Sequence, residues 1–142
     1  MTMTKKYKIL TQFIKDISAE TRDVETYLYV KENINKYHLN IDITSKALKN
    51  KLVEINTSLK FEDKDVNEKR SYFELIYATI ISVDDGINQK EELKKIILCD
   101  VQNVIYPSIE KAFLNLIHDS GFPEIKFEKK VDFEKLYNER FN

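Results

Sequence analysis

Polar and apolar residues alternate over three stretches of the chain, and this spacing predicts three half-buried β-strands. The first stretch runs from His38 to Thr44, and the cleanest one runs from Val53 to Phe61. The third, Ser71–Val83, has apolar residues on both faces, which is typical of a strand that is central or covered on each side. We therefore expect at least one sheet.

The parts between and before these strands are less regular. Apolar residues of Tyr7–Ile17 fit either a strand or a helix. The stretch from Ser18 to Tyr37 mixes tyrosines with charges, so we expect a long, partly ordered connection. A charged turn is expected at Glu62–Lys69.

Helical spacing begins near Gln89 and continues as far as Leu116. Pro107 would clash inside one continuous helix. A new N-cap at Asn103 would place it in a first turn, so we predict two consecutive helices. The apolar residues of Gln89–Gln102 cover more than one face, and we expect this helix to lie at a subunit interface.

The last part of the chain carries clear stop signals. Gly121 would end the second helix and Pro123 would prevent its continuation. We expect a short extended segment around Ile125 and Phe127, and a last amphipathic helix at Asp132–Phe141.

Composition restricts the class of protein. The 142 residues are enough for one domain, residues 1–142, with a real core. Twenty-three basic and 24 acidic side chains give a net charge of −1, which implies no general attraction to nucleic acid or to anionic lipid. The lone Cys99 fits a reducing compartment, and the N-terminus fits neither a signal peptide nor a membrane anchor. We expect a cytoplasmic protein with no membrane insertion.

The residue types that carry chemistry are sparse. His38 and His118 are isolated, and Cys99 has no partner nearby in the sequence. Two scattered glycines cannot form a phosphate-binding loop. We expect no enzyme activity, no cofactor and no metal. The aromatic connection Tyr27–Tyr37 leaves two readings open: its rings fold back on the core, or they line an apolar groove that receives another chain.

Four sequence motifs, in order, resemble the SecB family of bacterial export chaperones. They are Lys-Asp-Ile-Ser-Ala-Glu at 15–20, Asn-Val-Ile-Tyr-Pro at 103–107, Phe-Pro at 122–123 and Val-Asp-Phe-Glu-Lys-Leu-Tyr at 131–137. The resemblance extends from Tyr7 to Tyr137. It implies an α+β fold: a four-stranded antiparallel sheet, beginning with a strand from Tyr7, two consecutive long helices packed on it and a C-terminal helix.

The resemblance also implies two sets of binding residues. The surface that binds the SecA motor is expected at Asp16, Glu20, Tyr72 and Glu74. The groove for unfolded preproteins is expected to use Tyr27, Tyr29, Tyr37, Ile76 and Phe133.

By this resemblance the chain is expected to be an ATP-independent holdase that delivers preproteins to SecA, assembled as a homotetramer (a dimer of dimers). It departs from the family in being nearly neutral, where relatives are strongly acidic. Two alternatives stay open: a SecB-like chaperone dedicated to one client such as an antitoxin, and a non-catalytic structural oligomer.

Overall fold

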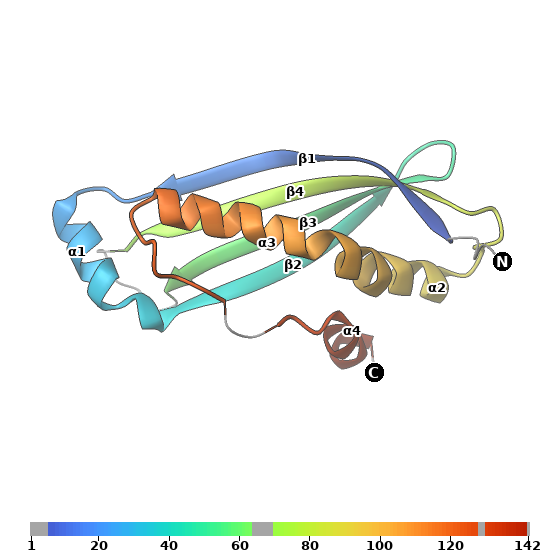
Figure 1. Ribbon diagram of the computed structural model, residues 1–142. Helices are drawn as coiled ribbons and strands as arrows, with labels where there is room; N and C mark the ends of the chain where they lie inside the picture. Colours follow the sequence, from blue (N-terminus) through green and yellow to red (C-terminus); the bar gives the residue numbers. More distant parts are fainter. Residues whose placement is uncertain (1–5, 64–69, 128–129, 142) are drawn as a thin grey trace.

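The computed structural model describes residues 6–63, 70–127 and 130–141, and the four strands among them form one antiparallel sheet (Figure 1). The strands are β1 (Tyr7–Glu20), β2 (Tyr37–Ala47), β3 (Leu52–Asp63) and β4 (Tyr72–Val83). Their order is β1-β4-β3-β2, so β1 and β2 are the edge strands. The predicted four-stranded antiparallel sheet is confirmed. Most of the predicted charged turn, residues 64–69, lies outside the described residues.

A single helical rod packs on one face of the sheet. It consists of α2 (Lys90–Lys95), a π-helical turn η2 (Ile96–Asp100) and α3 (Val101–Asp119), which follow one another without a break. The predicted pair of consecutive helices, with a new N-cap at Asn103, is therefore wrong.

The proline explains the error. Pro107 lies inside α3, and its ring removes the hydrogen bond to the carbonyl of Asn103. Both residues are exposed, so water can bind the freed carbonyl. The apolar residues that hold α3 on the sheet lie on its other side and are fully or almost fully buried: Val101, Ile105, Ile109, Phe113 and Ile117. Packing of this stripe outweighs the local cost of the proline.

The core lies between the rod and the inner face of the sheet. Strand β3 contributes alternate buried residues, among them Ile55 and Leu59, as its sequence pattern predicts. One polar pair crosses this layer: the Gln102 amide nitrogen donates to the Thr57 hydroxyl at 2.9 Å, and both side chains are fully buried. The pair fixes the position of α3 along β3, because any slip would break a buried hydrogen bond.

The connection from β1 to β2 is ordered, contrary to the prediction for Ser18–Tyr37. Strand β1 itself extends to Glu20, and α1 (Val24–Glu32) with the short 3-10 helix η1 (Ile34–Lys36) fills most of the rest. The Asp23 side chain caps α1 by accepting from the Thr26 amide at 2.7 Å. The sequence did not predict this helix, because only two of its residues, Thr26 and Val30, are buried, and tyrosines and charged residues surround them.

The stop at the end of α3 is where the sequence predicts it. Gly121 takes φ +108°, and the amides of Gly121 and Phe122 bond back to the last turn of the helix. The predicted extended segment around Ile125 and Phe127 forms no strand. The predicted C-terminal helix is confirmed as α4 (Phe133–Phe141).

Candidate functional site

An apolar groove lies between edge strand β2 and helix α4, which is drawn below β2 in Figure 1. Its volume is about 320 Å³. The lining residues are Ile41 and Ile43 of β2, Leu98 of η2, and Phe133, Leu136, Tyr137 and Glu139 of α4. Among the described residues β2 pairs with β3 alone, so its outer backbone groups are not used by another strand.

Helix α4 is attached to the rod through its first turn. The Phe133 ring packs edge-on against Tyr106 with ring centres 5.1 Å apart, and the Phe133 carbonyl accepts a weak 3.5 Å bond from the Cys99 thiol. The Asp132 carboxylate caps the helix by accepting from the Lys135 amide at 3.0 Å. Leu136, one turn later, is 45% exposed in the groove. One end of α4 is therefore anchored, while its apolar face is partly open to a ligand.

The titratable groups at this anchor favour a structural role. Burial, above all, raises the pKa of the Cys99 thiol, so it stays protonated at neutral pH. Burial also raises the pKa of Tyr106, and the nearby Glu110 adds to the effect. These groups line or support an apolar contact surface, and neither is prepared for nucleophilic chemistry.

The four residues expected at the SecA surface lie together on the open face of the sheet. Glu20 pairs with Tyr72 across β1 and β4, and Ser18 pairs with Glu74, so these side chains share one face. Asp16 lies on that face two residues before Ser18. The shared face depends on a bulge at Lys15, where the register shifts between Ile14 and Asp16.

The bulged residue forms an ion pair across the sheet. The Lys15 ammonium lies 2.8 Å from the Glu54 carboxylate and 3.4 Å from the Asn56 side-chain oxygen, both on β3. The bonds from Lys15 and Asn56 lower the pKa of Glu54. Lys15 thus neutralises Glu54. At the far end of the face Glu20 pairs with Arg22 at 3.4 Å and Glu74 lies opposite Lys60, so these carboxylates stand among basic side chains.

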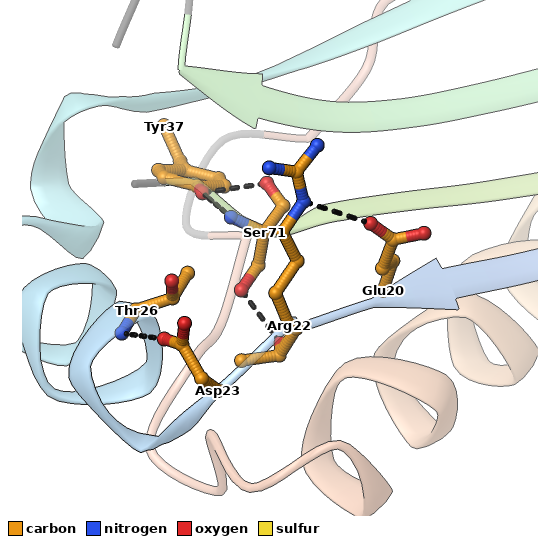
Figure 2. Close-up of polar contacts among 7 residues, drawn as sticks. Glu20, Arg22, Asp23, Thr26, Tyr37 and Ser71 are labelled. Atoms are coloured by element: carbon orange, nitrogen blue, oxygen red, sulfur yellow. Dashed lines mark hydrogen bonds and ion pairs between the residues drawn. The ribbon is translucent and has the colours of Figure 1, made fainter. Parts of the chain in front are cut away.

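The five residues expected in the preprotein groove are not brought together. Phe133 lies in the groove described above, whereas Ile76 lies on the open face opposite Asp16. Tyr27 and Tyr29 are half-buried in α1. Tyr37 is 7% exposed and its hydroxyl donates to the Ser71 carbonyl at 2.6 Å (Figure 2). Of the two readings of the tyrosine connection, folding back on the core describes Tyr37.

Two features of the structure were not predicted from the sequence. The groove residues Ile41, Ile43 and Leu98 were not nominated, although the alternation of β2 placed the first two on one face. The other feature is a set of four exposed apolar residues along β1, Leu10, Phe13, Ile14 and Ile17, each 46–47% exposed. They do not share one face, because Phe13 and Ile14 are consecutive residues of the strand. Their ambiguous spacing follows from two register shifts in β1, one near Leu10 and one at Lys15.

Within the described residues, no three His, Cys, Asp or Glu side chains gather as a metal site. In the same part of the chain, no helix has the length and apolar character needed to cross a membrane. His118 instead bonds through its Nε2 to the Ile125 carbonyl at 2.8 Å.

The fold and the groove define a class of protein. A sheet with one helical layer, and an apolar groove beside a free strand edge, suits the binding of an extended polypeptide. The sequence family described as Preprotein translocase subunit SecB matches residues 2–142. A protein of Pelagibacter ubique, provisionally named protein-export protein SecB, is 54% identical to this chain over 140 residues. The match covers 99% of this chain and 100% of that protein. Protein-export protein SecB of Bartonella quintana is 22% identical over 134 residues, which cover 94% of this chain and 83% of that protein.

A solved structure has a similar fold. It is a SecB-like chaperone of Mycobacterium tuberculosis in complex with a peptide from an antitoxin, with a TM-score of 0.64 and 13% identity. The similarity covers 88% of this chain and 91% of that one. The chain belongs to the SecB family, a family of protein-export chaperones.

Proposed function

We propose that this protein is an ATP-independent holdase, which binds unfolded preproteins in the groove between β2 and α4 and delivers them to SecA. The observation that carries the proposal is the groove itself. It has an apolar lining and a partly exposed Leu136, and it lies beside a strand whose outer edge has no partner among the described residues. An extended chain can add to such an edge through backbone hydrogen bonds while its side chains enter the apolar groove. Binding of this kind has little sequence specificity.

Suppression of aggregation tests the holdase activity. A slow-folding preprotein is diluted from denaturant with and without the protein, and light scattering is followed. We expect scattering to be suppressed at a stoichiometric ratio without ATP. An unchanged time course at this ratio would refute the proposal.

Delivery to SecA is proposed to use the acidic group on the open face. Asp16, Glu20 and Glu74 gather carboxylates on one flat surface, and a basic partner would gain from them both attraction and orientation.

Charge reversal at Asp16 and Glu20 to Lys tests the SecA surface. We expect a basic SecA tail peptide to bind about tenfold more weakly at low salt, as measured by calorimetry, while the affinity for an unfolded preprotein stays the same. Asp42→Lys is the matched control, since Asp42 is exposed on the same face of the sheet but on β2, with two strands between it and β1. If Asp42→Lys and the double variant lose equal affinity for the SecA tail peptide, the effect is one of general charge, and the assignment of the SecA surface to Asp16 and Glu20 is contradicted.

One observation supports a second candidate. The structurally similar chaperone of Mycobacterium tuberculosis holds an antitoxin peptide. A chaperone dedicated to one client would use the same groove without SecA docking. Failure of the unaltered protein to bind the SecA tail, together with selective binding of one client, would favour this candidate.

Assembly as a homotetramer is part of the proposal. The four exposed apolar residues of β1 lie along a sheet edge, on both of its faces, and a second copy that packs against this edge could cover them. Such packing would leave the groove at β2, on the opposite edge, open to clients. A cytoplasmic location is also part of the proposal, since the single Cys99, free and buried, fits a reducing compartment.

A further inference from the structure

The helical rod changes its winding at η2. The Val101 amide donates to the carbonyl of Ile96, five residues earlier, where an α-helix would use the residue four positions earlier. A π-helical turn of this kind contains one extra residue, and such turns are frequent at functional sites. The extra residue changes which side chains face the sheet.

Leu98 is the side chain that this turn moves. In a regular α-helix it would share a face with Val101 and Gln102, three and four residues later, which are both fully buried. The residues that are buried instead are Ile96 and Ile97, which lie five positions before those two. Leu98 is half-buried and lines the groove. The π-helical turn therefore takes Leu98 out of the core stripe and places it in the groove.

The same turn carries a contact that holds α4. The Cys99 thiol donates to the Phe133 carbonyl at 3.5 Å, and the Phe133 ring packs on Tyr106 further along the rod. Leu98 and the anchor of α4 thus move together with the rod. In an α-helix, a slip of one residue moves a side chain about 1.5 Å along the axis and about 100° around it. The shape of the groove is therefore sensitive to the register of the rod on the sheet.

One buried pair fixes this register close to the groove. The Gln102 amide donates to the Thr57 hydroxyl at 2.9 Å, and Thr57 lies directly opposite Ile43 in the ladder between β3 and β2. Ile43 lines the groove, whereas Gln102 and Thr57 are not among its lining residues. The pair thus connects the rod to the sheet next to the strand that forms the groove wall.

The buried pair is unfavourable for stability. Both side chains are fully buried, and among the described residues the Gln102 Oε1 has no hydrogen-bond partner. A buried acceptor without a partner destabilises the folded state, and two apolar side chains of similar size would avoid that cost. Buried polar residues can specify register at a cost in stability, as a single asparagine does in coiled coils. The cost therefore indicates that the pair serves register.

We propose that η2 and the Gln102–Thr57 pair together set the shape of the groove. The π-helical turn directs Leu98 into the groove, and the pair holds the rod at the register in which Leu98 and Phe133 line it together with Ile43. Gln102 and Thr57 are positioning residues, which act through Leu98 and α4. This inference rests on the proposed function only for the client that serves as one of its readouts.

The double variant Gln102→Leu with Thr57→Val tests the pair. It removes the buried acceptor and keeps the volume nearly the same, so the free energy of unfolding in urea should stay the same or rise. We expect the α4 amides to exchange about fivefold faster and a reduced, unfolded preprotein to bind about fivefold more weakly, because the competent groove is less populated.

Thr79→Val is the matched control for this variant. Thr79 is a fully buried threonine on the same face of the sheet, but on β4, and it accepts a 3.4 Å bond from the Gln12 amide of β1. The substitution removes a contact between a glutamine and a threonine away from the groove. It should leave α4 exchange and preprotein affinity at the values of the unaltered protein.

Deletion of Leu98 tests the turn. It would bring Ile96 to four residues before Val101 and so restore a regular α-helix with the same residues facing the sheet. We expect the deletion variant to have the stability of Leu98→Ala, which keeps the turn but loses the side chain, and to bind the preprotein equally weakly. A deletion variant that is much less stable than Leu98→Ala would show that the turn serves the core, and would overturn its assignment to the groove.

Two results with the double variant overturn the role of the pair. One is unchanged α4 exchange and preprotein affinity. The other is a loss of affinity that parallels a loss of unfolding free energy, which would make the pair structural only. If the unaltered protein binds no unfolded chain, the proposed function fails, whereas α4 exchange and stability still decide the positioning.

Discussion

The two edge strands of the sheet present their apolar side chains in different ways. On β1, Phe13 and Ile14 are each 47% exposed. On β2, Ile41 and Ile43 are half-buried, because α4 lies alongside and forms a groove with them. The strands have similar lengths and both have a free edge, so the difference comes from what covers the side chains.

This difference suggests separate functions for the two edges. Apolar side chains that stand in solvent along an edge strand are costly for a single chain and are well suited to a permanent contact with another copy. A groove beside a helix that is anchored at one end can admit a ligand and close again. We therefore assign β1 to assembly and β2 to clients, and this assignment can be tested edge by edge.

The largest effect is expected on β1. Ile14→Asp combined with Ile17→Asp would place two carboxylates in the proposed contact between copies, at a cost of about 4 kcal/mol, or roughly a thousandfold in association. We expect sedimentation to give the mass of a smaller assembly or of a single chain. Val24→Asp on α1 is the control for adding a charge at an exposed apolar position. An unchanged mass in the double variant would contradict the assignment of β1.

A smaller effect, a loss of stability at high pH, is expected from Tyr37 at the start of β2. Burial, chiefly, raises the pKa of Tyr37 to about 12 from an ordinary 10.0. Between these pH values the unfolded chain loses the tyrosine proton and the folded protein keeps it, so stability falls as the pH rises from 10 to 12. The loss attributable to Tyr37 is about 2–3 kcal/mol.

Urea unfolding at pH 9 and pH 12 measures this loss. Tyr37→Phe lacks the titration but keeps every other tyrosine, so the difference between the two proteins isolates Tyr37. The variant lacks the hydrogen bonds to Ser71, so it should be less stable than the unaltered protein at pH 9. This difference in unfolding free energy should become smaller or change sign at pH 12. A stability difference between the two proteins that stays constant from pH 9 to pH 12 would contradict the raised pKa of Tyr37.

The smallest effect is expected at the groove. Phe133→Ala removes the ring that anchors α4 on Tyr106, and we expect client affinity to fall about tenfold, or about 1.4 kcal/mol. The mass of the assembly should stay the same, because β1 is untouched. Val104→Ala, an exposed position on α3, is the matched control. A change of mass without a change of affinity would reverse the roles of the two edges.

Much of the fold follows from sequence pattern. The alternation of β3 and the apolar stripe of α3 are strong signals, because each buries a whole face against the other. The prediction that one helix ends and another begins near Pro107 was wrong. It considered only the backbone hydrogen bond that proline removes, whereas packing of α3 on the sheet keeps the helix continuous. Helix α1 was missed because its two buried residues, Thr26 and Val30, give too weak a period.

The candidate sites follow from the sequence to a smaller degree. Pairing of β1 with β4 places the residues nominated for the SecA surface on one face, while their role in binding stays a prediction. That placement depends on the bulge at Lys15, which shifts the register and cannot be read from alternation alone. The groove depends on where α4 docks, and a docking position comes from tertiary packing and not from spacing along the chain.

Hydrogen exchange with and without bound client tests the division between the edges most directly. The full-length protein is labelled alone and with a reduced, unfolded preprotein at saturating concentration. We expect slower exchange in residues 38–44 of β2 and in α4, with no change in residues 9–18 of β1. Slower exchange in β1 with no change in β2 and α4 would contradict it.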